Sequence, residues 1–131
     1  MLEDNVKIKT GEGVMKMSHL VPGLKIQTPQ GLKAIISVQR SRRSKLCYKF
    51  ITHDSKEIEC TSRQYFFLRD GGLIKASKIV VGTWLKTRKA NVKIKDVIQI
   101  LDKNKKFTTI IPSSNGGLFY LDNDILTLYK L

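Results

Sequence analysis

Apolar and polar residues alternate along short segments of this chain, and turn residues separate one segment from the next. Val6–Thr10 (VKIKT) and Val92–Leu101 (VKIKDVIQIL) alternate most clearly, and Leu32–Gln39 (LKAIISVQ) alternates less regularly. A side-chain period of two is typical of a half-buried β-strand. Gly-Glu-Gly at 11–13 and Pro-Gly at 22–23 are turn signals. Short strands between frequent turns predict an all-β domain without an amphipathic helix longer than two turns.

A hairpin is predicted from Leu46–Thr52 (LCYKFIT) through the turn His53–Lys56 to Glu57–Thr61 (EIECT). In this hairpin Cys47 and Cys60 should fall on the same face of the sheet. Two cysteines do not make a disulfide framework, so we expect both to be buried small apolar residues in a reducing compartment. The other predicted strands are Val14–Met17, Leu24–Thr28, Tyr65–Arg69, Phe107–Ile111, Leu118–Asp122 and Ile125–Tyr129.

The chain contains an internal repeat. Residues 13–28 (GVMKMSHLVPGLKIQT) match residues 72–87 (GLIKASKIVVGTWLKT) after a shift of about 59 positions. Two glycines, a serine and the apolar positions coincide between the copies. Each copy has a glycine turn, a short strand, a polar corner at the serine, a second glycine turn and a second strand. The repeat predicts a single domain, residues 1–131, with pseudo-two-fold halves at about 1–60 and 61–131.

Composition narrows the class of protein. A chain of 131 residues is long enough to bury a core, and no apolar run approaches the ~18 residues of a transmembrane helix. The amino-terminal MLEDNVKIK is acidic and then alternating, unlike a signal peptide, so we expect a cytoplasmic protein without a membrane partner. The net charge of +13 predicts attraction to polyanions such as nucleic acid, an acidic protein or an anionic membrane surface, and charge alone does not choose among them.

Four segments carry a resemblance to a known family: TPQG at 28–31, KEIECT at 56–61, GGLIKASKIVVGTWL at 71–85 and LFYLDNDILT at 118–127. In this order they resemble the Hint fold shared by inteins and hedgehog autoprocessing domains, most closely the small phage-type inteins. The resemblance covers essentially the whole chain. It implies a flat, horseshoe-like all-β domain with both termini at its centre, and for a phage protein it implies the cytoplasm of the host cell.

The resemblance also implies where splicing chemistry would reside. In inteins a Cys or Ser at the first position attacks the preceding carbonyl, and a Thr-x-x-His motif polarises that peptide. A penultimate His then assists cyclisation of a terminal Asn, and an Asp lies nearby. The corresponding positions of this chain are Met1 for the nucleophile, Thr61 and Gln64 for the Thr-x-x-His motif, Thr108 for the Asp, Leu128 for the penultimate His and Tyr129 for the Asn.

These substitutions predict that the chain is not an enzyme. A thioether at position 1 cannot accept an acyl group, and neither Gln64 nor Leu128 supplies an imidazole. Lys130 occupies the place of the acceptor nucleophile, and no shift of the alignment by one position recovers a His-Asn pair. We therefore expect neither splicing nor self-cleavage from a domain that has kept the fold.

Other chemistry has little support in the sequence. His19 and His53 lack partners at metal-ligand spacing, so we expect surface histidines and no metal or other cofactor. Asp122 and Asp124 are turn residues, and a nuclease centre would need a third carboxylate. The connector Thr87–Asn91 is too short to hold the endonuclease of homing inteins. No glycine-rich phosphate loop is present, and no small-molecule substrate is expected.

Basic residues cluster in two acid-free runs. Arginine and lysine interleaved with aromatic residues can contact phosphates and stack on bases, although a solvated, solubilising surface has the same composition. The candidate nucleic-acid-binding residues are Arg40, Arg42, Arg43, Lys45, Tyr48 and Lys49 in the first run and Lys86, Arg88, Lys89, Lys93 and Lys95 in the second. A third, shorter cluster is Lys103, Lys105 and Lys106.

A protein-interaction module is the alternative function. The same positive surface could bind an acidic patch on a host or phage protein. A sheet edge near Ile125–Leu131 could also add a strand to a partner. An exposed apolar patch near Leu128 and Tyr129 would favour this alternative, and basic clusters that merge on one concave face would favour nucleic acid.

Overall fold

The computed structural model describes residues 1–41, 46–101 and 104–129. The first half of the chain forms β1 (Leu2–Glu3), β2 (Lys7–Thr10), β3 (Gly13–Lys16), β4 (Lys25–Thr28), β5 (Gly31–Ser41), β6 (Leu46–Thr52) and β7 (Glu57–Thr61). The second half forms β8 (Gln64–Phe67), β9 (Leu73–Lys75), β10 (Trp84–Leu85), β11 (Val92–Leu101), β12 (Phe107–Pro112), β13 (Phe119–Tyr120) and β14 (Leu126–Tyr129). The all-β prediction is confirmed.

Helical structure in the described ranges is confined to three short 3₁₀ turns. They are η1 (Met17–His19), η2 (Ala76–Lys78) and η3 (Asn115–Gly117). No helix among these residues is long and apolar enough to cross a membrane.

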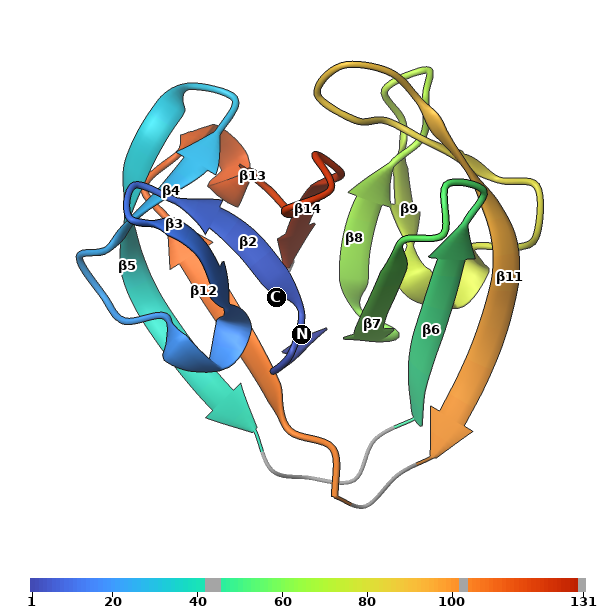
Figure 1. Cartoon of the computed structure of the whole chain (residues 1–131), viewed down its shortest axis with the longest axis horizontal. Coiled ribbons are helices and arrows are strands. Elements are labelled where there is room, and N and C mark those ends of the chain that lie inside the picture. The colour runs from blue at the N-terminus through green and yellow to red at the C-terminus, as the bar shows by residue number, and fades with distance from the viewer. Residues whose placement is uncertain (42–45, 102–103, 130–131) are drawn as a thin grey trace.

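The strands form two open antiparallel sheets. One has ten strands in the order β10-β11-β6-β7-β1-β12-β5-β4-β2-β3, and the other has four in the order β13-β14-β8-β9. Figure 1 shows two curved lobes, one around β2–β5 and β12 and the other around β6–β9 and β11, with both chain ends between them. The short strand β1 joins the lobes because it pairs with β7 on one side and with β12 on the other. This arrangement is the expected horseshoe.

The internal repeat recurs in the backbone. The 3₁₀ turns η1 and η2 occupy equivalent places in the two copies. After each of them a glycine with positive φ, Gly23 at 89° and Gly82 at 92°, lets the chain reverse. The amide of Gly23 donates to the carbonyl of Ile35 and that of Gly82 to the carbonyl of Ile94, both at 2.8 Å. The same turn is therefore built twice, as the sequence match predicts.

The two copies exchange their long strands. β5 of the first copy pairs with β12 of the second, and β11 of the second copy pairs with β6 of the first. The predicted division near residues 60 and 61 therefore divides the sequence into copies, whereas each lobe contains strands from both. Strand exchange buries apolar surface between the copies, so neither copy can form its lobe alone.

The core lies where the sheets curve around one another. Phe50 and Phe66 are fully buried and meet edge to face, with ring centroids 6.2 Å apart. Full burial of such a side chain stabilises the fold by roughly 1.5–3 kcal/mol. A smaller cluster contains Met1, Cys47 and Phe107.

Two expectations about individual residues are corrected by the strand register. Cys47 lies opposite Thr61 and Cys60 lies opposite Tyr48, so the two thiols point to opposite faces of the hairpin. Both are buried, as expected, and no disulfide joins them. The segment expected as a sheet edge, Ile125–Leu131, contains β14, which lies between β13 and β8 instead. Residues 130 and 131 of that segment lie outside the described residues.

Candidate functional site

The positions that correspond to the intein nucleophile and its threonine come together at the centre of the molecule. Both residues are buried, with Met1 7% and Thr61 5% exposed. The amino-terminal nitrogen of Met1 donates to Oγ1 of Thr61 at 2.7 Å, and the amide of Thr61 donates to the carbonyl of Met1 at 2.8 Å. The Met1 side chain packs against Cys47 and Phe107. The side chain at position 1 is therefore a thioether packed among apolar side chains, at the place where an intein has its nucleophile.

Gln64 occupies the position of the histidine in the Thr-x-x-His motif. Its side chain is buried at the start of β8, and its Nε2 donates to Oγ1 of Thr127 at 2.7 Å and to the carbonyl of Leu128 at 3.0 Å. The hydroxyl of Thr127 donates in turn to the carbonyl of Tyr65 at 2.7 Å. Gln64 therefore ties β8 to β14, and both of its N–H groups are occupied within the protein.

The last two splicing positions lie on the same strand pair. Leu128 is buried and opposes Tyr65, and the backbone of Tyr129 opposes Gln64. The fold thus brings the positions of the penultimate histidine and the terminal asparagine next to that of the motif histidine. Lys130 lies outside the described residues.

Thr108, at the position of the intein aspartate, is buried and takes part in a second, partly buried network. Its hydroxyl donates to Oδ1 of Asp4 at 2.8 Å and accepts from Nη1 of Arg40 at 2.9 Å. The guanidinium of Arg40 also donates to the carbonyl of Met17 at 3.2 Å and to that of Leu20 at 2.7 Å. Arg40, expected to contact nucleic acid, therefore has three acceptors inside the protein.

The thiol beside this centre is not an activated nucleophile. Cys60 precedes Thr61 and is fully buried. Burial raises the pKa of Cys60 to about 12, because an apolar environment disfavours the thiolate. The thiol is therefore protonated at physiological pH.

The first predicted basic run is mostly unavailable to a ligand in its described part. Tyr48 is only 8% exposed and stacks on Phe50, so the expectation that its ring could stack on a base is wrong. Nζ of Lys49 lies 3.1 Å from a carboxylate oxygen of Glu57 and 4.0 Å from one of Glu59. The remaining predicted members, Arg42, Arg43 and Lys45, lie outside the described residues, as does Lys103 of the third run.

The second basic run surrounds an exposed tryptophan. Trp84 is 37% exposed, and Leu85 beside it is buried, so Trp84 and Lys86 point to the outer face of the sheet. Lys93 pairs with Trp84 across the strands and shares its face, and Lys95 is exposed at the β-bulge between Ile94 and Asp96. The exposed members of the run are Lys86, Arg88, Lys89 and Lys95.

Two cations lie over the ring of Trp84. The guanidinium of Arg69 is 5.3 Å from the ring centroid and Nζ of Lys93 is 5.9 Å from it. As far as the structure describes the chain, no carboxylate pairs with Lys86, Arg88, Lys89, Lys93 or Lys95. The sequence analysis missed Trp84 and Arg69. The alternation of Trp84, Leu85 and Lys86 was the sequence signal that could have placed the indole and the ammonium group on the same exposed side of the strand.

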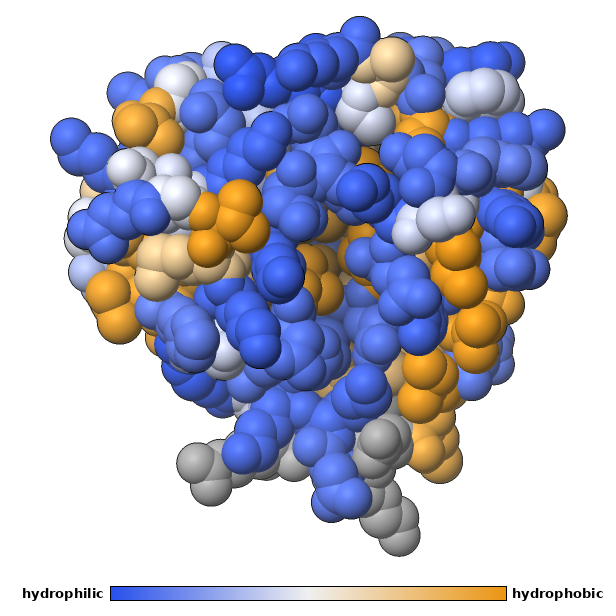
Figure 2. Space-filling view, viewed as in Figure 1, coloured by the Kyte–Doolittle hydropathy of each residue, from blue (hydrophilic) through white to orange (hydrophobic). Residues whose placement is uncertain are grey.

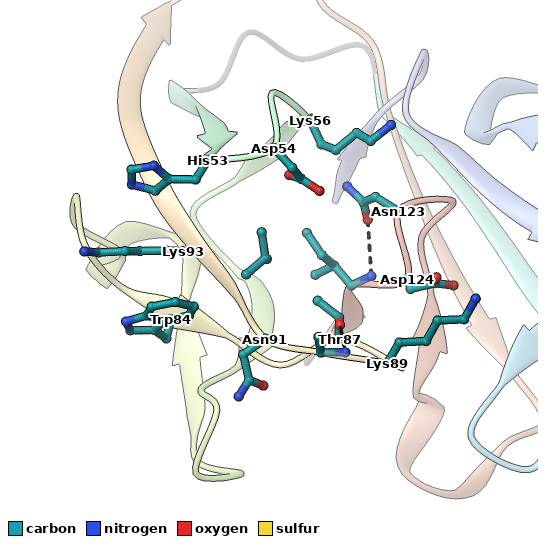
Figure 3. Close-up of a pocket in the computed structure, with 13 residues that line it drawn as sticks. His53, Asp54, Lys56, Trp84, Thr87, Lys89, Asn91, Lys93, Asn123 and Asp124 are labelled. Carbon is teal, nitrogen blue, oxygen red and sulfur yellow. Dashed lines mark hydrogen bonds between the residues drawn. The ribbon is translucent and has the colours of Figure 1, made fainter.

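A pocket of about 690 Å³ opens on one side of Trp84, where three turns meet (Figure 3). Its lining comes from the β6–β7 turn, the β10–β11 connection and the β13–β14 turn. Figure 3 shows the side chain of Lys56 reaching toward Asn123 on one side, with Trp84 and Lys93 together on the other. His53 lies at this rim and His19 on η1; both are exposed, as expected. No group of three or more potential metal ligands occurs within the described ranges.

Solved structures with the same architecture are inteins or intein-like domains. The gp41-1 intein superimposes with a TM-score of 0.83 at 26% identity, over 97% of this chain and 96% of that one. The fold of this chain is the Hint fold of inteins. An intein-like domain from Clostridium thermocellum has a TM-score of 0.80 at 17% identity over 99% of both chains. A DnaB intein from Synechocystis has a TM-score of 0.80 at 14% identity over 99% of this chain and 98% of that one.

Sequence comparison alone finds no matching family model and no match among curated proteins. The comparison of structures therefore finds relatives that these sequence comparisons do not. The central hollow of this Hint domain, seen in Figure 2 with apolar side chains at its base and hydrophilic ones around it, lies where Figure 1 draws the two chain ends.

Proposed function

We propose that this Hint domain does not splice and acts as a basic nucleic-acid-binding module. The absence of splicing follows from the chemistry of the side chains at the splicing positions. Acyl transfer needs a nucleophilic side chain at position 1, and a thioether has none. Proton transfer needs a group that titrates near neutral pH, and neither the amide of Gln64 nor the alkyl chain of Leu128 does so.

The surroundings of Trp84 carry the proposal of nucleic-acid binding. Bases of any sequence stack on an exposed aromatic ring, and lysine or arginine beside the ring contacts the phosphates. Trp84 has Arg69 and Lys93 over its ring, and Lys86 and Lys95, each two residues along the chain from Trp84 or Lys93, are both exposed. We name these five residues the Trp84 face. Their cations are available for phosphates because no carboxylate in the described part of the chain neutralises Lys86, Lys93 or Lys95.

A protein-interaction module remains the alternative, on a different surface from the one expected. Leu128 is buried and β14 is internal, so the carboxy-terminal strand does not offer a docking edge. Ile98 and Leu101 of β11 are 42% and 70% exposed. Figure 2 shows apolar surface along the outer edge of the lobe that contains β11. That strip favours a protein partner with an apolar contact surface.

Fluorescence anisotropy with labelled single-stranded and duplex DNA and RNA tests nucleic-acid binding. Five phosphate contacts would give a log–log salt slope of about −3.5 for a single strand and about −4.5 for a duplex. The double variant Lys86→Glu/Lys95→Glu should lose most of the affinity. Lys16→Glu/Lys25→Glu changes the net charge equally on exposed strands of the other lobe and should bind nearly as well as the unmodified chain. No binding at low salt would refute the proposal and favour the protein-interaction module.

Splicing is tested separately. The chain is placed between two reporter segments and incubated, with the gp41-1 intein between the same segments as a positive control. We expect the precursor to persist without ligated or cleaved products, as judged by electrophoresis and mass spectrometry. Any ligated product would contradict the proposed loss of splicing.

A further inference from the structure

The pocket beside Trp84 is lined by turns that hydrogen bonds hold in place. The amide of Arg88 donates to the carbonyl of Asp124 at 2.9 Å, and the amide of His53 donates to the carbonyl of Lys93 at 3.0 Å. The side chain of Asn123 accepts from the amide of Ile125 at 3.2 Å, the bond drawn in Figure 3. These bonds join all three turns, so a ligand would not have to order them on binding.

The polar groups of the pocket favour an anion. Lys56, Lys89 and Lys93 line it, against the two carboxylates Asp54 and Asp124. Asp124 is already paired, since Nζ of Lys9 lies 2.7 Å from its Oδ1. Three lysines therefore outnumber one uncompensated carboxylate, and Figure 3 shows them at separate points of the rim, Lys56 toward Asn123, Lys89 toward Asp124 and Lys93 beside Trp84. Lysine ammonium groups are common phosphate ligands in proteins.

The apolar part of the pocket favours a planar ring as well as an anion. Ala90, Val92 and Ile125 contribute alkyl surface, and the indole of Trp84 forms a wall. The volume of about 690 Å³ lies within the range of about 300–1,000 Å³ that is common for small-molecule sites. Inorganic phosphate alone would leave this apolar surface uncovered.

Hydrogen-bonding groups complete the lining. The carboxylate of Asp54 accepts from Oγ1 of Thr52 and retains acceptor capacity toward the pocket, which it lines. A sugar hydroxyl or a base N–H can donate to it. The amides of Asn91 and Asn123 can both donate and accept.

We infer that this pocket binds a nucleoside monophosphate unit, with the phosphate on Lys56 and the base against Trp84 and the alkyl side chains. The unit is either a free nucleotide or one nucleotide of a single strand threaded past the Trp84 face. The second source rests on the proposed function. A base in a duplex is stacked and paired, so duplex DNA does not fill the pocket without extruding a base.

The single tryptophan of the chain provides a direct assay, because Trp84 lines the pocket. Nucleoside 5′-monophosphates, inorganic phosphate and short single-stranded oligonucleotides are titrated while Trp84 fluorescence is followed. The variant Lys56→Glu reverses a charge inside the pocket. Lys16→Glu, exposed on β3 in the other lobe, makes the same change of net charge outside it. Circular dichroism and urea unfolding establish that both variants fold.

We expect saturable quenching by monophosphates and by single strands, and none by inorganic phosphate at equal concentration. Lys56→Glu should weaken the binding of monophosphates and of single strands about tenfold or more, because one charge-assisted hydrogen bond is lost. Lys16→Glu should leave monophosphate binding unchanged. If neither ligand quenches Trp84, or if both variants behave alike, the pocket inference is overturned.

The two proposals fail in different ways. Strand binding that persists by anisotropy, with no monophosphate quenching and no special effect of Lys56→Glu, overturns the pocket inference and leaves the proposed function intact. Monophosphate quenching that depends on Lys56, with no strand binding at any salt concentration, refutes the proposed function and supports a pocket for free nucleotides.

Discussion

The buried contact between Gln64 and Thr127 gives a quantitative test of how the Hint scaffold is held together where an intein would have its motif histidine. Thr127→Val replaces the hydroxyl by a methyl group of similar size. It removes the acceptor of one Gln64 N–H and the donor to the carbonyl of Tyr65. Since both side chains are about 1% exposed or less, water cannot substitute without opening the structure.

Leaving a buried polar group without a partner costs about 1–3 kcal/mol. We therefore expect Thr127→Val to lower the free energy of unfolding by about 2–3 kcal/mol. Gln64→Leu removes both donors and should cost about 1–2 kcal/mol, because a carbonyl and a hydroxyl lose a bond but no buried N–H is left alone. The double variant replaces both partners by apolar groups, so it should cost about 1–2 kcal/mol less than the sum of the single changes.

Urea unfolding followed by circular dichroism, with linear extrapolation, measures each of these free energies. Nucleic-acid affinity serves as the control and should not change, since the contact is buried away from the Trp84 face. Additive effects, or a Thr127→Val chain within about 0.5 kcal/mol of the unmodified one, would refute the reasoning, because Gln64 would then find other partners at no cost.

Three further predictions concern single residues. Arg40→Met should lower the free energy of unfolding in urea by about 2–3 kcal/mol, because three hydrogen bonds to buried acceptors are lost. Its nucleic-acid affinity should not change. A folded variant with weaker affinity would show that Arg40 contacts the nucleic acid. Burial raises the pKa of the Cys60 thiol to about 12 from its ordinary value of 9.0, so the unfolded chain releases this proton first. The stability that this thiol contributes is therefore full below pH 9 and is lost as the pH rises toward 12. Cys60→Ala should flatten the decline of the urea midpoint over that window, and an unchanged pH profile would contradict the shift. Gly82→Ala should cost about 1–2 kcal/mol because its φ is 92°, whereas Gly11→Ala, at a glycine without positive φ, should cost less; equal costs would argue against the repeated turn.

The alternation of apolar and polar residues located the strands well. β6, β7 and β11 begin and end at the predicted residues, because their side chains alternate and turn residues bound them. β8 departs from its prediction, Tyr65–Arg69. It ends at Phe67 because the chain already turns there, with the amide of Gly71 bonded to the carbonyl of Leu68 at 2.8 Å. A continuous apolar run does not mark where such a turn begins.

The residues that occupy the splicing positions were read from the sequence, and so was the repeat. Motif order alone was enough to propose the Hint fold, since short motifs keep their order even when few residues are identical. Which polar residues are available to a ligand was not predictable. Tyr48 and Arg40 both stand in a basic run, but pairing with distant strands buries the ring of Tyr48 and provides acceptors for the guanidinium of Arg40, which stays exposed.

The sequence by itself determined the local structure and which side chains occupy the splicing positions, because alternation, turn residues and side-chain type act within a few positions of the chain. Only the tertiary structure decided how the copies exchange β6 and β12, that Cys47 and Cys60 face opposite ways, and that Trp84 stands beside a pocket. Those features depend on which strands pair across long separations. Pairing of that kind is decided by burial of the whole core rather than by any one segment.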